Sequence, residues 1–430
     1  RAVRFDRHYA GGFPTMPTRA DHATGRWTMS FMGWEPLPEG VDTLAQTLAE
    51  SGLHTAAVVD TPFFVRGGMN YDRGYQTFFL HPGQDAPGTK EPALGHRHES
   101  QDVRQAWRYE SDSNAAQTVV RAMGWLERHY KEDFFLLVDT WDPHEPWDSP
   151  AYYTEPYWPG YDGEVIDPLY GRWQDVPGFT EEKVRKAHAT YCGQITMVDT
   201  WIGFLLKRVE NMGLMENTAI IFTSDHGFYF GEHGGLFGKM SFSKGPEGRL
   251  PRQGDTGVGW THSPLYEELV HIPLLVYAPG VGAGSYNGLT SAVDVMPTVL
   301  DVLDQKIPDA VQGVSLLPRM RDTSLQGREY VVSTIPFANP GDPVRSVDDF
   351  RRDLRAPLVT TVTAGDMSLL YSAEPGMSEL FDLNADPAQE ANVLSSRPEV
   401  GKELHQLLRR FMHDSNVASH LVDTRVELKT

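Results

Sequence analysis

Residues 219–227 read AIIFTSDHG, an apolar, β-branched run that ends in an aspartate, a histidine and a glycine. Similar runs are TAAVVD (55–60), FFLLVDT (134–140) and PLLVYAP (273–279). Nearly continuous apolar strands of this kind are typical of a parallel sheet that is covered on both faces. The four runs therefore predict an α/β domain with a central, mostly parallel sheet.

Two helical patterns lie between these strands. One covers about residues 114–130 and follows the polar run SDSN, which suits the start of a helix. In the other, apolar residues are spaced by four, three, four and three positions, which predicts one buried stripe. The residues of that stripe are Tyr191, Ile195, Val198, Ile202 and Leu205. Helices that alternate with strands support the α/β interpretation.

The pattern changes in the last quarter of the chain. Short alternating runs, REYVVSTIP, PLVTTVTAG and DMSLLYSAE, are separated by turns and followed by the amphipathic segment VGKELHQLLRRFM. This order predicts a small antiparallel sheet with one closing helix. We therefore expect an α/β domain over residues 1–324 and a C-terminal α+β subdomain over residues 325–430.

Composition excludes several classes of protein. The formal net charge is −20 and no lysine or arginine cluster forms a basic stripe, which argues against nucleic-acid binding. No uninterrupted apolar run approaches the ~18 residues of a membrane span. The single cysteine fits a reducing compartment and favours the cytoplasm over secretion. No prediction follows for the oligomeric state.

Polar side chains follow three of the predicted strands. They are Asp60 after the run at 55–60, Asp139, Asp142 and His144 after the run at 134–140, and Asp225 and His226 after the run at 219–225. In an open α/β sheet, functional residues gather at the carboxyl ends of the strands. Aspartates there are also common turn formers. An adjacent carboxylate and imidazole, as in Asp225 and His226, can bind one divalent cation, although a metal-free SDHG turn is the alternative.

A threonine between two prolines is the second unusual feature. Residues 11–26 read GGFPTMPTRADHATGR, and Pro17 suits the first turn of a helix that Gly25 ends. Thr15 would then lie at a helix N-terminus, which favours anions. Arg19, one turn later, could hold the same anion. A plain helix cap is the alternative for Thr15.

These segments, taken in order, resemble the sulfatase family of the alkaline phosphatase superfamily. The resemblance rests on TMPTR with ATGR, DPHEPW, FTSDHGFYFGEHGGLFGK, LYEELVHIPLLVYAPG, SAVDVMPTVLDVL with QGVSLLP, and ELFDLNADPAQEANVL. It implies an alkaline-phosphatase-like fold and a hydrolase of sulfate or phosphate esters that uses a divalent metal, Ca, Mn, Mg or Zn. The implied partner is a small anionic ester.

The resemblance also assigns roles to single residues. It implies that Thr15 is the nucleophile with Arg19 beside it, that Asp225 and His226 are metal ligands, and that His144 contacts the leaving oxygen. The family's metal site takes two further aspartates from a first strand, which we expect upstream of Arg1.

Thr15 departs from the family pattern, because sulfatases convert a cysteine or serine at this position into formylglycine. Threonine does not suit that conversion. A threonine alkoxide on a metal, with Thr15 itself as a ligand, resembles instead the phosphodiesterases and phosphoryl transferases of the superfamily. Such a site would form a covalent phosphothreonine that water then hydrolyses.

Two further departures concern substrate contacts. The family's Gly-Lys-Trp-His segment is replaced by VVDTPFF, which puts Asp60 at the lysine position. About twenty residues appear inserted between GGLFGK and THSPLYEEL, so the family's second lysine corresponds either to Lys239 or to His262. We favour His262 as the general acid and retain Lys239 as a substrate contact.

Four functions follow from these observations. The leading hypothesis is a hydrolase of phosphodiesters, phosphonate monoesters or phosphate monoesters that uses Thr15. A sulfatase is the second hypothesis, and phosphoryl transfer to an acceptor other than water is the third. A non-catalytic relative that binds ligands in the same cleft is the fourth, and the retained SDHG segment argues against it.

Overall fold

The computed structural model describes residues 1–33, 35–61, 68–83, 107–239, 241–242, 260–261, 264–335, 359–373 and 375–429. The chain divides into two units, and each is described by itself. Unit 1 comprises Arg1–Leu44, Thr218–Tyr229 and Trp260–Thr430. Unit 2 comprises Ala45–Asn217 and Phe230–Gly259. The predicted boundary after residue 324 stays a prediction.

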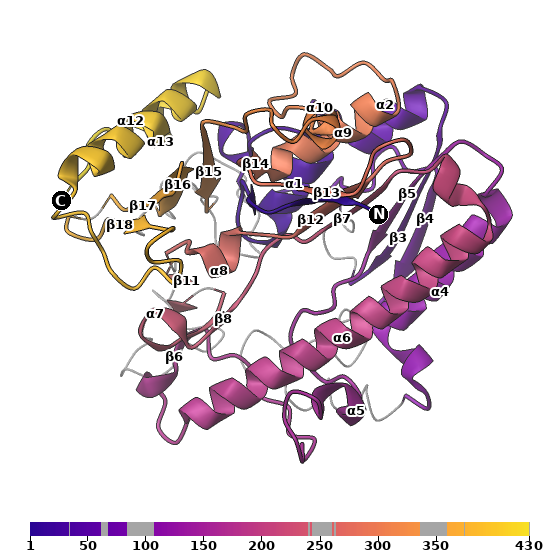
Figure 1. Ribbon diagram of the computed structural model, residues 1–430, viewed down its shortest axis with the longest axis horizontal. Helices are drawn as coiled ribbons and strands as arrows, with labels where there is room; N and C mark the ends of the chain where they lie inside the picture. Colours follow the sequence, from indigo (N-terminus) through magenta and orange to yellow (C-terminus); the bar gives the residue numbers. More distant parts are fainter. Residues whose placement is uncertain are drawn as a thin grey trace. The chain divides into compact units, whose positions relative to one another are not determined.

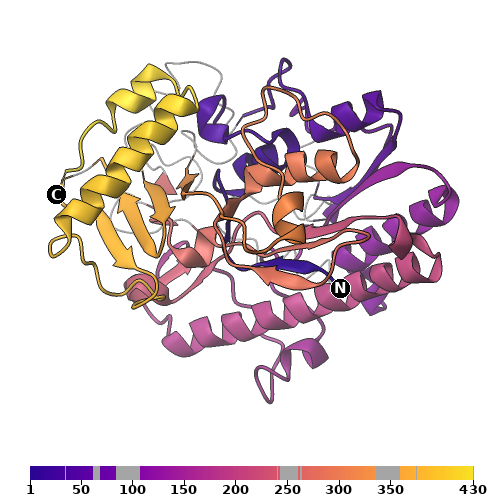
Figure 2. The same cartoon turned by 45° about the horizontal axis from the view of Figure 1, so that its top comes forward.

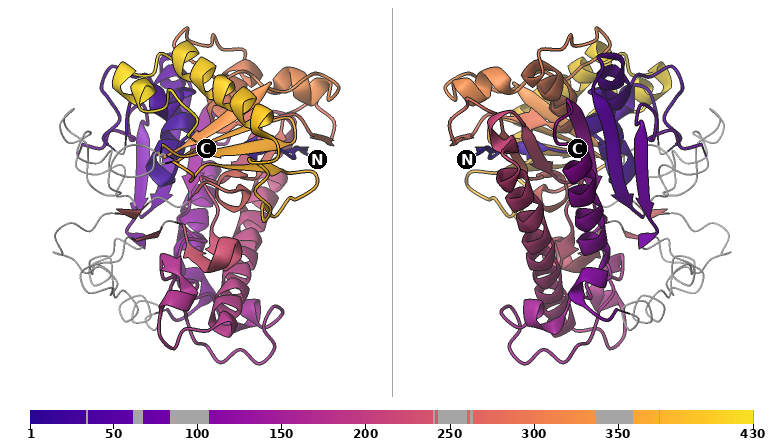
Figure 3. Two further views of the ribbon diagram at one scale, coloured as in Figure 1. Left: turned by 90° about the vertical axis from the view of Figure 1, so that its left-hand side faces the viewer. Right: turned by 90° about the vertical axis from the view of Figure 1, so that its right-hand side faces the viewer.

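Unit 2 is built on a parallel sheet of order β4-β3-β5. The run TAAVVD lies in β3, and FFLLVDT lies in β5, as the sequence predicts. The helix α4 packs on β3 and β5 and lies beside the long helix α6 (Figure 1, Figure 3). The principal elements of unit 2 are α2 (Leu44–Glu50), β3 (His54–Asp60), β4 (Thr77–His81), α4 (Asn114–His129), β5 (Phe134–Asp139), α5 (Ala151–Thr154), β6 (Gly171–Arg172), α6 (Glu181–Asn211), α7 (Glu232–Gly235), β9 (Leu236–Gly238) and β10 (Ser241–Phe242).

The helix α4 begins where the polar run predicts. Ser113 is its N-cap residue, and its hydroxyl accepts a hydrogen bond from the backbone N–H of Ala116. The predicted stripe of α6 is only partly correct, because Ile195 is 41% exposed. The buried face of α6 lies to one side and includes Ala187, Gln194 and Met197. Many residues of this buried face are small or polar, so they do not stand out in a pattern of large apolar residues. The spacing of the large residues therefore predicted a stripe beside the buried face.

Unit 1 contains a mixed sheet and an antiparallel sheet, of orders β13-β1-β12-β7 and β15-β16-β17-β18. Its elements are β1 (Val3–Phe5), β2 (His8–Tyr9), α1 (Thr15–Thr24), β7 (Ile220–Thr223), β11 (Trp260–Thr261), α8 (Glu267–Val270), β12 (Leu274–Tyr277), β13 (Gly284–Tyr286), β14 (Thr290–Ser291), α9 (Val295–Val302), α10 (Leu317–Arg321), β15 (Tyr330–Thr334), β16 (Thr360–Ala364), β17 (Met367–Tyr371), β18 (Glu379–Asp382), α12 (Pro398–Asp414) and α13 (Ser419–Asp423). The strand β8 (Tyr229–Phe230) falls at the border of the units.

Strand direction in the mixed sheet differs in one detail from the expectation. The strands β7 and β12 are antiparallel neighbours, and β12 also runs antiparallel to β1. An apolar run gives no sign of its direction, so the sequence alone could not distinguish these pairings. The parallel arrangement holds in the sheet of unit 2.

The C-terminal antiparallel sheet and its helix are confirmed. The helix α12 lies across β15, β16 and β17 (Figure 2). Its buried residues Leu404, Leu408 and Phe411 join the sheet residues Val332 and Leu369 in one apolar cluster. Burial of such side chains contributes roughly 1.5–3 kcal/mol each, which accounts for the amphipathic spacing seen in the sequence.

A buried ion pair joins two distant segments of unit 1. The carboxylate of Asp294, fully buried before α9, accepts hydrogen bonds from the Arg328 guanidinium and from the backbone N–H groups of Ser291 and Val314. Replacing Asp294 by alanine should lower the free energy of unfolding by about 3–5 kcal/mol, because it leaves the guanidinium charge without its partner. Urea unfolding of the two proteins measures this difference.

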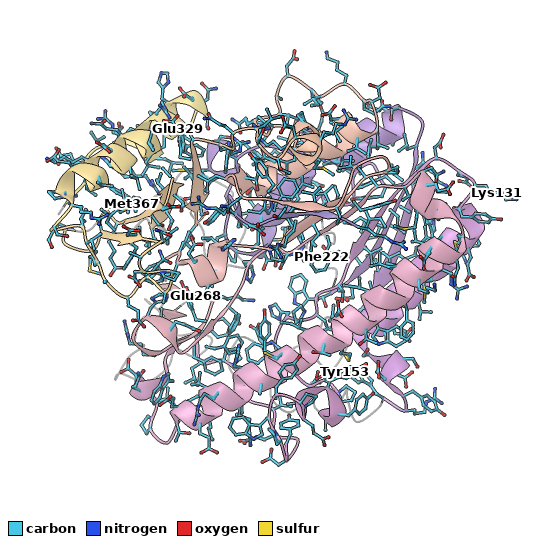
Figure 4. All side chains as sticks on the ribbon, viewed as in Figure 1. Lys131, Tyr153, Phe222, Glu268, Glu329 and Met367 are labelled. Carbon is cyan, nitrogen blue, oxygen red and sulfur yellow. The ribbon has the colours of Figure 1, made fainter. Side chains whose placement is uncertain are left out.

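The control is the exposed pair between Glu329 and Arg410 (Figure 4). Solvent screens this pair, so Glu329→Ala should leave the unfolding midpoint almost unchanged. If the two variants lost similar amounts of unfolding free energy, the buried Asp294–Arg328 pair would be no more important for stability than an exposed pair.

Candidate active site

The helix α1 of unit 1 presents Thr15 at its first position. Pro14 is the N-cap residue and no side chain caps the helix, so capping does not account for Thr15. The Thr15 side chain is buried, and its Oγ1 lies 3.3 Å from Nε2 of His226. The structure therefore brings together the predicted nucleophile and one predicted metal ligand, which are separated by more than two hundred residues in the sequence.

The loop before Thr15 is fixed by two side chains of α1. Asp21 is completely buried and accepts a hydrogen bond from the backbone N–H of Gly12. The Thr18 hydroxyl contacts the carbonyl oxygens of Gly12 and Pro14. A Cβ atom at Gly12 would lie 2.5 Å from Cβ of Pro17, so only glycine allows this close approach. These contacts hold the start of α1 in one position.

The SDHG segment forms a turn that is locked against the end of α8. The backbone N–H of His226 donates to Oδ1 of Asp225 over 2.9 Å, and the N–H of Gly227 donates to the carbonyl of Leu269 over 2.9 Å. A Cβ atom at Gly227 would lie 1.9 Å from the carbonyl oxygen of Glu268. The glycine of this motif is therefore required for close packing, while the two residues before it face Thr15 and Arg19.

The hydrogen bonds of His226 define which of its nitrogens carries a lone pair. Nδ1 lies 2.9 Å from the carbonyl oxygen of Gly227, which can only accept, so Nδ1 carries the hydrogen. In the neutral ring Nε2 then presents its lone pair toward the Thr15 hydroxyl. The Phe13 ring packs edge-on against this imidazole, with centroids 5.2 Å apart. Such a lone pair can accept a proton from Thr15 or bind a cation.

Asp225 supplies the negative charge of this group. Its Oδ2 atom is hydrogen-bonded to Arg19 and lies 3.9 Å from Nε2 of His226. That separation is less than twice a bond of ~2.0–2.2 Å from a divalent ion such as zinc to nitrogen or oxygen. One cation could therefore contact both atoms, so the donors of Asp225 and His226 fit a divalent metal, and the Thr15 hydroxyl lies 3.3 Å from the same Nε2 atom. Arg19 lies beside it, as the sequence predicts.

In unit 2, Asp60 lies at the carboxyl end of β3 and is completely buried. Its carboxylate accepts hydrogen bonds from the hydroxyls of Thr118 and Thr140 and from the backbone N–H of Trp141. These contacts tie β3 to α4 and to the segment after β5. Asp60 therefore links secondary structure elements, and its predicted contact with substrate stays a prediction.

His144 and Lys239 of unit 2 are in direct contact. Nζ of Lys239 lies 2.7 Å from Nε2 of His144, and Nδ1 of His144 donates to the Glu145 carbonyl over 2.8 Å. The Glu145 carboxylate lies 3.7 Å from Nζ of Lys239 and 3.5 Å from Nδ1 of His144. The ammonium thus donates a hydrogen to the neutral imidazole, and one proton is held between the two side chains. His262 lies outside the described residues, so its role as general acid stays a prediction.

Sequence reasoning missed two residues of these groups. Asp21 and Glu145 lie beside residues that were identified, but neither forms a recognisable pattern with them. Asp21 is the seventh residue of α1 and stands between Arg19 and His22, so the sequence gives no sign that it is buried. Glu145 stands between His144 and Pro146, which gives no indication of its contact with Lys239.

Comparison with known proteins identifies the class and then the family. Among solved structures, a phosphonate monoester hydrolase from Agrobacterium radiobacter has a TM-score of 0.71 and 21% identity, with 96% of this chain and 89% of that chain covered. A protein solved with its substrate D-glucosamine-2-N,6-O-disulfate has a TM-score of 0.69 and 18% identity, with 96% and 91% covered. The chain therefore shares its fold with these two proteins.

The family follows from the sequence. The sulfatase family model matches residues 1–305, and the chain belongs to the sulfatase family. An arylsulfatase from Clostridium perfringens is 28% identical over 331 residues, which cover 72% of this chain and 59% of that protein. Bovine arylsulfatase K is 26% identical over 329 residues, which cover 70% and 55%. The chain thus spans somewhat more than half the length of these curated relatives. Among the described residues, none of the helices has the length and apolar character needed to cross a lipid bilayer.

The buried carboxyl group of Asp142, close to His144 in the sequence, should make the stability of the protein depend on pH. Burial first, and then the carboxylates of Asp60 and Asp148, raise the pKa of Asp142 above its ordinary value. The folded protein then binds more protons than the unfolded chain, so the free energy of unfolding falls as the pH rises above about 4, the ordinary pKa of aspartate. Asp142→Asn imitates the protonated carboxyl and should reduce this fall between about pH 4 and about pH 8, the pKa of Asp142 in the folded protein, as measured by urea unfolding. Equal pH dependence in both proteins would contradict this account.

Proposed function

We propose that this chain carries the catalytic centre of a metal-dependent hydrolase that acts on phosphodiesters, phosphonate monoesters or phosphate monoesters through Thr15. The observation that carries the proposal is the 3.3 Å contact between Oγ1 of Thr15 and Nε2 of His226 at the start of α1. An alcohol is a poor nucleophile unless a neighbouring group or a metal activates it. Either the imidazole lone pair, acting as a base, or a cation bound by Asp225 and His226 would serve that purpose.

The reaction is a substitution at phosphorus in two stages. Oγ1 of Thr15 forms a bond to phosphorus while the bond to the leaving oxygen breaks, which gives a phosphothreonine. Water then attacks phosphorus and releases Thr15. A divalent cation held by Asp225 and His226 would lower the pKa of the attacking oxygen and neutralise charge on the phosphoryl group. Arg19 and the N-terminus of α1 would stabilise the same anion.

The leaving oxygen needs a proton, and His144 with Lys239 is the proposed source. The family resemblance assigns His144 to that oxygen, and in unit 2 its Nε2 atom already shares a hydrogen with Lys239 over 2.7 Å. The Glu145 carboxylate, 3.7 Å from Nζ of Lys239, adds a negative charge beside this pair. We therefore prefer Lys239 to His262 as the residue that corresponds to the second lysine of the family, and His262 is the alternative.

Sulfate-ester hydrolysis is the second candidate, and the curated arylsulfatase relatives favour it. A panel of p-nitrophenyl sulfate, phosphate, phosphodiester and phosphonate esters, assayed with the full-length protein and Ca²⁺, Mn²⁺, Mg²⁺ or Zn²⁺, separates the two. We expect the highest kcat/KM for one of the phosphorus esters. A preference for the sulfate would exclude the leading proposal.

Thr15 can be tested with variants of nearly equal shape. Thr15→Val removes only the hydroxyl and should abolish turnover, whereas Thr15→Ser retains a nucleophile and should keep measurable activity. Thr15 makes no capping hydrogen bond, so the thermal midpoint of the valine variant should stay close to that of the parent. Quenched-flow mass spectrometry should detect a covalent phosphoryl group on the parent and not on the valine variant. If the activity of Thr15→Val stayed within tenfold of that of the parent, the assignment of Thr15 as the nucleophile would be wrong.

His144 can be tested by varying the leaving group. A proton donor matters most when the leaving oxygen is basic, because a weakly basic phenolate departs without help. His144→Gln should therefore lower kcat/KM by about 100-fold or more for an alkyl ester and much less for the p-nitrophenyl ester. Gln117→Ala, a change elsewhere in unit 2, serves as the control. An equal loss for both esters would show that His144 does not protonate the leaving oxygen.

A further inference from the structure

A second cluster of metal-binding side chains lies in unit 2. His54, His129 and Glu132 each place one nitrogen or oxygen atom within 4.8 Å of those of the other two. His54 is the first residue of β3, and Asp60 is the last. At ~3.3 Å per residue, the cluster lies roughly 20 Å from Asp60, at the opposite end of the strand. It is therefore separate from the residues at the carboxyl edge of the sheet.

The fold brings the three residues together by local pairing. His129 ends α4, and the backbone N–H of Glu132 in the following turn donates to the His129 carbonyl over 2.9 Å. The same turn leads into β5, whose first residue, Phe134, is paired with His54. The N–H of His54 donates to the carbonyl of Asp133 over 2.9 Å, so the strand and the turn are joined by backbone contacts as well.

The side chains face one another through their metal-binding atoms. Oε2 of Glu132 lies 2.5 Å from Nδ1 of His54, and Oε1 lies 2.9 Å from Nδ1 of His129. The other nitrogen of His54, Nε2, lies 3.2 Å from the Thr77 hydroxyl. If Nε2 carries the hydrogen and donates it to Thr77, Nδ1 presents a lone pair to a carboxylate that can only accept. If the Thr77 hydroxyl donates to Nε2 instead, Nδ1 carries the hydrogen and donates it to Glu132, so this contact holds either a hydrogen or a metal ion in its place.

Surrounding groups hold the two imidazoles in place. The completely buried Trp125 stacks on His129 with ring centroids 4.7 Å apart and meets His54 edge-on at 5.2 Å. Metal-binding histidines commonly have their second nitrogen fixed by such a partner, as Thr77 fixes His54. The ligand side chains are 21%, 25% and 46% exposed for His54, His129 and Glu132, so ions can enter from solvent. Lys131, in the same turn, points outward (Figure 4).

We propose that His54, His129 and Glu132 form a binding site for Zn²⁺ or a chemically similar divalent transition metal. Two imidazole nitrogens and one carboxylate suit these ions, whereas Ca²⁺ and Mg²⁺ prefer oxygen ligands. The bound ion clamps the start of β3 to the turn between α4 and β5. Its role is to stabilise unit 2, and it is independent of the proposed hydrolysis at Thr15.

The test is a Zn²⁺ titration by isothermal calorimetry, combined with thermal unfolding. All proteins carry Asp225→Asn, so that the donors near Thr15 contribute as little as possible. Glu132→Gln is compared with Glu127→Gln, the same change five positions earlier in the sequence. His129→Asn is a second variant, and circular dichroism of each protein without metal establishes that it is folded. Ca²⁺ and Mg²⁺ are titrated in parallel.

We expect one equivalent of Zn²⁺ to bind to the Glu127→Gln protein and to raise its thermal midpoint. In the Glu132→Gln and His129→Asn proteins, the Zn²⁺ affinity of this site should fall by at least ~10-fold, because changes to residues that only support metal ligands already cause losses of that size. The thermal midpoint of these two proteins should no longer rise when Zn²⁺ is added. Ca²⁺ and Mg²⁺ should have no comparable effect. The proposal would be overturned if all variants bound Zn²⁺ equally, or if Zn²⁺ did not change the thermal midpoint of the Glu127→Gln protein. The three side chains would then be joined by hydrogen bonds alone.

Discussion

The geometry around Thr15 depends on one buried carboxylate, that of Asp21. It accepts hydrogen bonds from the N–H of Gly12 and from the N–H and hydroxyl of Thr28, over 2.5, 2.9 and 2.6 Å. Buried N–H groups without such an acceptor would cost several kcal/mol in all. Burial raises the pKa of Asp21 to about 7, while the hydrogen bonds from Thr28 and Gly12 oppose that shift. The same interaction therefore fixes the loop before α1 and, through it, the direction of the Thr15 hydroxyl.

Carboxylates near strand ends differ in burial and in their contacts in this protein. Asp60 and Asp294 are completely buried and accept several hydrogen bonds from neighbouring segments, so they join elements of the fold. Asp225 is partly exposed, and its Oδ2 atom faces Arg19 and the His226 ring. A pattern of aspartates after strands identifies candidates for a site. Only the surroundings of each carboxylate distinguish a ligand from a structural link.

The sequence predicted the features that depend on local pattern. The strands β3, β5, β7 and β12, the start of α4 and the C-terminal antiparallel sheet all follow from periodicity and turn residues. Features that depend on distant partners could not be predicted. The direction of β12, the contact of Lys239 with His144 and the cluster of His54 with Glu132 join segments that are far apart in the chain. The apparent insertion before THSPLYEEL left Lys239 and His262 as alternatives for the family's second lysine.

The replacement of a formylglycine precursor by threonine restricts the chemistry that this site can perform. A formylglycine hydrate releases its product by re-forming a carbonyl, whereas a threonine ester has no such path and must be cleaved by attack of water on the central atom. That second attack needs either a group that accepts a proton from the water or a bound cation that makes the water more acidic. Because Nδ1 of His226 donates to the Gly227 carbonyl, Nε2 keeps a lone pair next to Thr15, and that lone pair can take up a proton or bind the proposed cation, but not both at once. A transferred phosphoryl group is open to such attack by water, which is why the proposed function places phosphorus esters before sulfate esters.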